Sequence, residues 1–265
     1  MRRLVAVLLM VAIALASGCI GSGVGLTEEK VLNAVQGIDT AKYAQNFSMS
    51  MYFIEPHTNR TVNLTALGHV TGVFNRTANV ETGNMSMRVH ASGMNITLNW
   101  PYFINGSTAY FKIDGRWYRA EQDDLYTEAS GSLNVKYIEN LLKTKNVTIE
   151  KLADGYAFRV NVTFWEYVKA TNQTSYLRDK WGNESRVNVT TRSGWVEVHL
   201  REDGTPTFIE TYMNLVLSIS GLNGEEIDVH MVIHNSVSLF DINGHVEINA
   251  PEGINKAKNL EEALW

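Results

Sequence analysis

The residues of this chain that could perform chemistry are few and scattered. His230 and His234 have a metal-binding spacing only on a helix, and the alternating stretch around them predicts a strand that would hold them about 13 Å apart. Asp123 and Asp124 are typical of a helix start. The sequence contains no Gly-x-Ser-x-Gly, His-Glu-x-x-His, phosphate loop or Cys/His metal spacing. We therefore predict that the protein is not an enzyme and needs neither a metal nor a cofactor.

Covalent modification is marked more clearly, at Cys19, the single cysteine of the chain. Arg2 and Arg3 precede an apolar run over residues 4–16, which is typical of a signal peptide and too short to span a bilayer. Residues 15–19, Leu-Ala-Ser-Gly-Cys, resemble the lipobox of prokaryotic lipoproteins. A lone thiol forms no intramolecular disulfide, so lipid attachment is its better use in an exported protein. The alternative is a plain secretory signal with an incidental cysteine.

These features predict three segments: a signal peptide over residues 1–18, a lipidated tether over 19–26 and a single domain over 27–265. Loss of residues 1–18 from the 265-residue chain leaves 247, with 21 basic residues against 28 acidic ones and a net charge of −7. A mildly acidic chain without a basic run argues against nucleic acid as a partner. We expect the domain outside the cytoplasm, anchored through its lipid to the outer face of the cell membrane.

Period-two alternation of apolar and polar residues predicts most of the mature chain to be strands. Asp-Gly and Asn-Gly dipeptides separate these runs and favour tight hairpins, as between Thr108–Ile113 and 116–120, and between 213–219 and 227–233. The expected result is an antiparallel meander. One predicted helix begins at Thr27 and ends at Gly37, and others are predicted over 125–132, 135–142 and, as a weak terminal helix, 255–264. The aromatic segment over 164–180 is predicted to be a helical or loop excursion over the sheet.

Methionine placement is the sharpest sign of a binding surface. All the methionines of the mature chain fall on the apolar side of a predicted strand, although methionine is not a favoured strand residue. Its flexible thioether suits irregular or adaptable apolar surfaces. One interpretation is a deformable ligand pocket, and the other is ordinary gap-filling in a packed core. The predicted ligand-lining residues are Phe47, Met49, Met51, Phe53, Met85, Met87, Met94, Met213, Leu215, Leu217 and Met231.

Asn-x-Ser/Thr sequons form the second unusual pattern, because the chain has twelve where about three are expected from its 24 Asn and its 37 Ser plus Thr. Alternation explains only part of this excess, since asparagine is a poor strand former. We predict N-glycosylation on an outward face and, with the lipid anchor, an archaeal cell surface. The candidate sites are Asn46, Asn59, Asn63, Asn75, Asn84, Asn95, Asn105, Asn146, Asn161, Asn172, Asn183 and Asn188.

Two stretches carry a family resemblance: residues 108–118, Thr-Ala-Tyr-Phe-Lys-Ile-Asp-Gly-Arg-Trp-Tyr, and residues 239–251, Leu-Phe-Asp-Ile-Asn-Gly-His-Val-Glu-Ile-Asn-Ala-Pro. With the lipobox and the strand order, they resemble LolA/LppX/LprG-type lipoproteins over about residues 28–252. The resemblance implies a mainly β, α+β fold, in which a strongly curved antiparallel sheet forms a half-barrel with helices on its concave side. It also implies a lipid or another apolar ligand between sheet and helices, and no catalytic residues. The sequence departs from the family at His245, where proline is common, and in a longer aromatic segment over 164–193.

The leading hypothesis is therefore a membrane-anchored lipoprotein that binds or carries a hydrophobic ligand. The alternative is a structural or adhesive glycosylated surface module with a packed core and no ligand. An exported hydrolase is a third hypothesis, because the fold, and not sequence spacing, brings paired carboxylates together in glycosidases.

Overall fold

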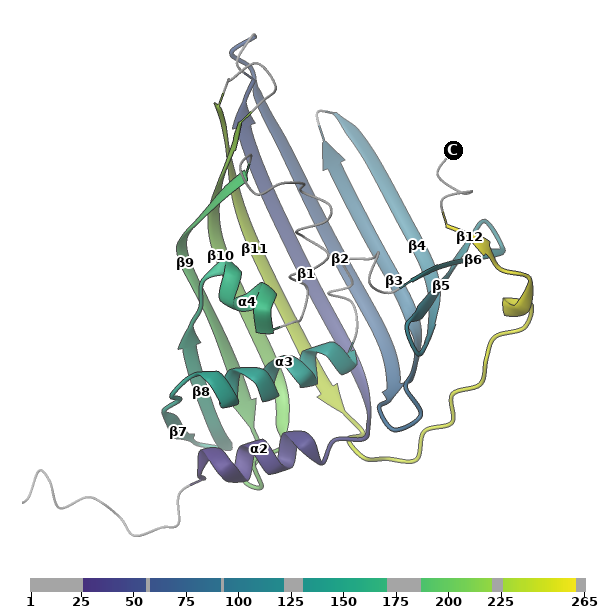
Figure 1. Cartoon of the computed structure of the whole chain (residues 1–265), viewed down its shortest axis with the longest axis vertical. Coiled ribbons are helices and arrows are strands. Elements are labelled where there is room, and N and C mark those ends of the chain that lie inside the picture. Colours follow the sequence, from purple (N-terminus) through teal and green to yellow (C-terminus); the bar gives the residue numbers. More distant parts are fainter. Residues whose placement is uncertain are drawn as a thin grey trace, which may run out of the picture.

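A computed structural model describes residues 26–55, 58–91, 93–121, 131–170, 187–220 and 226–260. Within these residues the chain forms one open, curved sheet of twelve strands in the order β12-β6-β5-β4-β3-β2-β1-β11-β10-β9-β8-β7 (Figure 1). All neighbours are antiparallel except β12 and β6. The mainly β fold with few helices is as predicted. In the same part of the chain, no helix is long and apolar enough to cross a membrane.

The strands are β1 Thr40–Ile54, β2 Thr61–Asn75, β3 Val80–Ala91, β4 Met94–Asn105, β5 Thr108–Ile113, β6 Arg116–Glu121, β7 Ile149–Leu152, β8 Gly155–Asn161, β9 Val187–Leu200, β10 Pro206–Ser220, β11 Glu226–Phe240 and β12 Lys258–Asn259. The helices are α2 Glu28–Gln36, α3 Gly131–Thr144, α4 Phe164–Ala170 and the short 3-10 helix η3 Ile254–Lys256.

Two meanders make the sheet, and one seam joins them. Strands β1 to β6 pair in sequence order, and so do β7 to β11. The hairpin between β5 and β6 turns at Asp114 and Gly115, whose φ angles of 48° and 79° are those that Asp-Gly supplies at low cost. The seam pairs β1 with β11, from Lys42 opposite Phe240 to Tyr52 opposite His230. No turn connects these two strands, so the packing of their side chains, and not a turn, must set the register of their backbone pairing.

Strand alternation gives the sheet an inner and an outer face. The register places Tyr43 of β1 beside Gly72 of β2 and Leu239 of β11 on the inner face, which carries the apolar core. Residues that alternate with these along the same strands, such as Lys42 on β1 and Ser238 on β11, lie on the outer face and are exposed. One face is therefore packed and the other solvated, as is common for antiparallel sheets.

Helices α2 and α3 pack on the inner face at one end of the strands, and α4 packs on β9 farther along the sheet (Figure 1). Thr27 caps α2 by accepting a hydrogen bond from the Lys30 backbone N–H, and Gly37 ends the helix, as predicted. Val31 and Val35 of α2 and Ile138 of α3 are fully buried. We call the end of the strands that α2 and α3 cover proximal and the opposite end distal.

Charged side chains fasten α2 and α3 to the proximal end of β2. The guanidinium group of Arg76 donates to the carbonyl oxygens of Val35 and Ile38 at 3.3 and 3.0 Å. Glu139 of α3 lies 3.7 Å from Arg76 and accepts a hydrogen bond from the Gln36 amide. These contacts link α2 and α3 to each other and to the proximal end of β2.

Two predicted helices need comment. The helix predicted over 135–142 lies within α3, whereas most of the one predicted over 125–132 falls outside the described residues. The predicted terminal helix over 255–264 is wrong for its described part. There, η3 ends after one turn, and Lys258 and Asn259 pair in parallel with β6. The Leu260 N–H donates to the Arg119 carbonyl oxygen at 2.8 Å, so strand pairing replaces the weak helical preference of this tail.

Candidate functional site

The inner face changes from buried to open along each central strand. On β1, Ala41, Tyr43 and Gln45 have no exposed surface, whereas the inner-face residues from Phe47 to Phe53 are only half-buried. Strand β2 changes in the same way, from the buried Phe74 to half-buried residues at its distal end. Among the described helices, α3 packs on β1 and β2, α2 packs against α3 and β10, and α4 packs on β9. The apolar residues at the distal ends of β1 to β4 stay half-buried or exposed, so within the described residues this part of the inner face is open apolar surface.

We name this surface the open apolar face. It consists of the half-buried or exposed apolar residues on the distal inner side of β1 to β4, β10 and β11: Phe47, Met49, Met51, Phe53, Val62, Leu64, Met85, Met87, Val89, Met94, Ile96, Leu98, Trp100, Ile219, Ile227, Met231 and Ile233. Large contiguous apolar surfaces of this kind are unusual on soluble proteins and mark sites of interaction.

The eleven residues predicted to line a ligand site all lie on the inner face. Met213, Leu215 and Leu217 are 1%, 1% and 8% exposed and belong to the core. Leu215 pairs with Thr191, whose hydroxyl accepts a hydrogen bond from the Phe164 N–H, so α4 lies over this part of the sheet. The other eight lie on the open apolar face, where Met94 is 63% exposed at the start of β4.

A buried polar belt lies on the inner face, on the proximal side of the open apolar face along β1, β3, β4 and β11. The belt consists of Tyr43, Gln45, Glu81, Tyr102, Thr211 and Asn235, all on the inner face. The Gln45 amide donates to the Asn235 side-chain oxygen at 3.0 Å across the β1–β11 seam. Gln45 bonds to Asn235, and the two tyrosines bond to Glu81, so hydrogen-bonded polar groups limit the open apolar face on its proximal side along these strands.

A tyrosine pair closes the belt around a buried carboxylate. The Tyr43 hydroxyl donates to Glu81 Oε1 at 2.6 Å, and the Tyr102 hydroxyl contacts both this oxygen, at 3.2 Å, and the Tyr43 hydroxyl. Burial raises the pKa of both tyrosines well above their usual value of about 10, and the Glu81 carboxylate adds to the rise. Both phenols therefore stay protonated and donate.

Paired glycines make room for these rings. Gly72 and Gly83 are opposite one another on β2 and β3. A Cβ atom on Gly83 would lie 2.2 Å from the Thr71 carbonyl oxygen and 2.6 Å from the Tyr102 hydroxyl. The sequence alone did not lead us to the belt, although Glu81 stands in register with Met85 and Met87 of the same apolar alternation.

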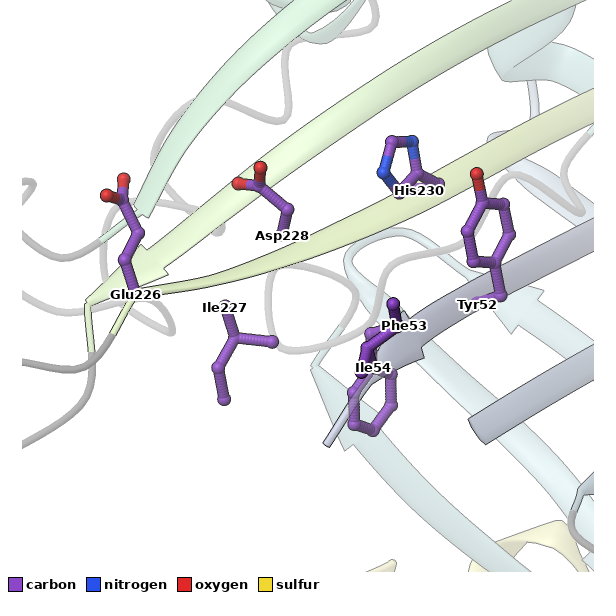
Figure 2. Close-up of a pocket in the computed structure, with 7 residues that line it drawn as sticks. All are labelled: Tyr52, Phe53, Ile54, Glu226, Ile227, Asp228 and His230. Atoms are coloured by element: carbon purple, nitrogen blue, oxygen red, sulfur yellow. The ribbon is translucent and has the colours of Figure 1, made fainter. Parts of the chain in front are cut away.

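A notch opens at the distal end of the seam. It is a pocket of about 480 Å³ lined by Tyr52, Phe53, Ile54, Glu226, Ile227, Asp228 and His230, which Figure 2 shows around the ends of β1 and β11. Phe53 and Ile227 are members of the open apolar face, so the two features are continuous. Sequence reasoning missed the notch, because it depends on pairing between strands far apart in the chain.

The remaining predicted residues lie elsewhere. His230 stacks on Tyr52 with ring centroids 4.6 Å apart, and His234 Nε2 lies 2.7 Å from Glu210 Oε1, so their contacts are with other side chains on the outer face. Among the described residues, no group of three His, Cys, Asp or Glu side chains could hold a metal ion. Cys19, the signal segment, Asp123, Asp124, Asn172 and Asn183 lie outside the described residues.

The described sequon asparagines lie on the outer face or in loops. The register places Asn46, Asn63, Asn84 and Asn95 on the outer face of β1 to β4, where all four are exposed. The others are Asn59, Asn105, Asn146, Asn161 and Asn188, which are also exposed, and Asn75, which is half-buried. The candidate glycosylation face is thus opposite to the open apolar face.

No protein-family model matches the chain, and no curated protein matches it. Similar solved structures include LprF from Mycobacterium bovis, at 10% identity over 85% of this chain and 95% of that chain, with a TM-score of 0.39. Lipovitellin, whose structure describes lipid–protein interactions, is 10% identical over 80% of this chain and 26% of that chain, with a TM-score of 0.34. A DUF1329 family protein from Desulfovibrio piger is 7% identical over 84% and 93%, with a TM-score of 0.25. All three TM-scores are below 0.5, and the family resemblance stays a prediction.

Proposed function

We propose that this protein binds or carries a lipid or another hydrophobic ligand against the open apolar face. In this proposal the sheet is a half-barrel, the helices lie on its concave side and the ligand occupies the distal part of that side. The observation that carries the proposal is the open apolar face itself, where methionine and phenylalanine side chains stay half-buried although the proximal part of the same strands is buried.

The energetics favour a chain-like apolar ligand. Each 100 Å² of apolar surface removed from water contributes about 2.5 kcal/mol. Methionine side chains adapt to different chains because their thioethers are flexible and polarizable. The polar belt supports the same proposal, since it limits the apolar surface on its proximal side. An acyl chain that extended farther in that direction would meet hydrogen-bonded polar groups. Contacts of this kind bind without chemical change, so we propose a non-enzymatic protein.

The cellular part of the proposal rests on Cys19 and the sequons. We propose a lipoprotein that is anchored to the outer face of the cell membrane and glycosylated on its outer face. The exposure of the outer-face asparagines supports this arrangement, because glycans there would leave the open apolar face free. The variant Cys19→Ser should release the protein from membranes in detergent-free buffer. Continued membrane association of this variant would contradict the anchor.

Native mass spectrometry tests ligand binding directly. The delipidated protein is exposed to membrane extract, and we expect retained species whose added mass matches lipid. Met51→Asp places a charge on the open apolar face and should abolish retention, whereas Ser50→Asp, the adjacent outer-face residue, should not. Circular dichroism confirms that both variants are folded. If the parent protein retains no apolar molecule, the structural or adhesive module becomes the better explanation.

A further inference from the structure

The backbone separates at the distal end of the seam. The β1–β11 pairing stops at Tyr52 and His230. The β1–β2 pairing continues to Ile54, and the β10–β11 pairing continues to Glu226. Two hairpin ends therefore diverge, and the notch lies between them (Figure 2).

The notch connects the two faces of the sheet. Phe53 and Ile227 belong to the inner face, whereas Tyr52, Asp228 and His230 alternate with them and belong to the outer face. Figure 2 shows the Tyr52, Asp228 and His230 side chains on one side of the strands and Ile227 on the other. A ligand chain lying on the open apolar face could thus pass its polar end through the notch to water.

The polar side of the notch favours positive charge. Glu226 and Asp228 bring two exposed carboxylates, and the Ser218 hydroxyl donates to Asp228 Oδ1 at 2.6 Å. Tyr52 is 46% exposed and stacks on His230, which lies between Tyr52 and Asp228, so the imidazole covers one face of the tyrosine ring (Figure 2). Glu55 follows the β1 end and Arg60 precedes β2, so these two nearby charges offset each other. The carboxylates attract an ammonium group, and the face of Tyr52 that His230 leaves open adds to this attraction.

We propose that the notch holds the head group of the ligand and selects a positively charged amine over an anionic carboxylate. This inference rests on the proposed function, because the apolar chain of the same ligand would occupy the open apolar face. An acyl chain with an anionic head group would place like charges beside Glu226 and Asp228, which costs affinity.

Three probes with one chain length test the selection. Octadecylamine, octadecanol and stearate compete with a fluorescent apolar probe for the full chain, purified and delipidated, at neutral pH and below their aggregation concentrations. We expect octadecylamine to bind about tenfold more tightly than stearate, with octadecanol between them. Added salt should reduce the difference, since exposed charges are screened.

Matched variants locate the effect. Glu226→Gln with Asp228→Asn should remove the amine preference and leave octadecanol binding unchanged. Glu197→Gln, an outer-face carboxylate on β9, should keep the preference. If octadecanol binds but the parent protein shows no amine preference, or if the notch variant keeps it, the inference is overturned and the proposed function stands. If none of the three probes binds, the proposed function fails, and this inference fails with it.

Discussion

Methionine has two environments on one face of this sheet, and they differ in what surrounds the thioether. Met213 of β10 is 1% exposed and packs in the core beneath the helices. Met231, on the adjacent β11, is half-buried on the open apolar face. Because the residue type and the sheet face are the same, a comparison of Met213 with Met231 distinguishes a role in core packing from a role in surface binding.

Truncation should therefore affect the two methionines differently. Met213→Ala should lower the free energy of unfolding by about 2–5 kcal/mol, because it leaves a cavity in a packed core. Met231→Ala removes fewer contacts and should cost less than about 1.5 kcal/mol, but it should weaken binding of an apolar probe. Urea unfolding and probe titration measure the two effects. Equal, large losses of stability without any probe binding would indicate a solid core.

Glu139 carries a pH-dependent contribution to stability. A hydrogen bond from Lys143 holds the pKa of its carboxyl below the usual value of about 4.5, and Gln36 and Arg76 lower it further. The contribution is therefore present above the pKa of the unfolded chain and is lost as pH falls through the lower folded pKa. Glu139→Gln should cost about 0.5–1 kcal/mol at neutral pH.

Urea unfolding at several pH values from 7 to 3 measures the contribution of Glu139 to the free energy of unfolding. The difference in the free energy of unfolding between the parent protein and Glu139→Gln should become smaller below about pH 4.5. Glu150→Gln, at an exposed position on β7, is the control and should change stability little at any pH. A pH-independent difference for Glu139→Gln would mean that the charge is not responsible.

At the scale of elements, the glycines of β2 and β3 allow large rings to lie across the sheet. The Phe47 ring occupies the space above Gly68, and the Tyr43 and Tyr102 rings occupy the space above Gly72 and Gly83. These aromatic–glycine pairs cross neighbouring strands, where glycine lets another group approach the backbone closely.

A methyl group at Gly83 should be poorly tolerated. Gly83→Ala places Cβ against backbone and the Tyr102 ring, so we expect a loss of about 1–3 kcal/mol or more. Gly37→Ala is the comparison, because its φ of −76° suits any residue and its nearest contact would be 3.3 Å away. Thermal unfolding of both variants gives the difference, and equal stability would show that the β2–β3 region relaxes freely.

Sequence patterns predicted the local strands and hairpins but not the pairing between strands that are far apart in sequence. The Asp114-Gly115 hairpin and the pairing of 213–219 with 227–233 follow from turn chemistry and alternation, and the structure confirms both. The inner-face position of the methionines follows from the same period. No local signal marks the β1–β11 seam, and both the notch and the Gln45–Asn235 hydrogen bond of the polar belt depend on it. The tail was predicted incorrectly because its strand partner, β6, is about 140 residues away in sequence.

At the scale of the whole molecule, the two faces of the sheet divide the proposed roles between ligand and glycan. Asn46→Gln and Asn84→Gln should each remove one glycan mass from protein made in its native host, since both asparagines are exposed on the outer face. Apolar probe binding should not change, because the open apolar face is on the other side. An intact parent mass equal to the bare polypeptide plus lipid would contradict glycosylation.

The seam also governs how the sheet must assemble. Gln45 and Asn235, which hydrogen-bond across it, are 190 residues apart in sequence. Within each meander, paired strands follow one another in sequence, but the two meanders can join only after β11 exists, and closing such a long loop is entropically slow. For a chain exported from its amino-terminal end, as proposed here, β1 keeps one unpaired backbone edge until nearly all of the chain has crossed. Folding time, and the interval in which β1 could pair with a wrong strand, are then set by its last long strand, β11.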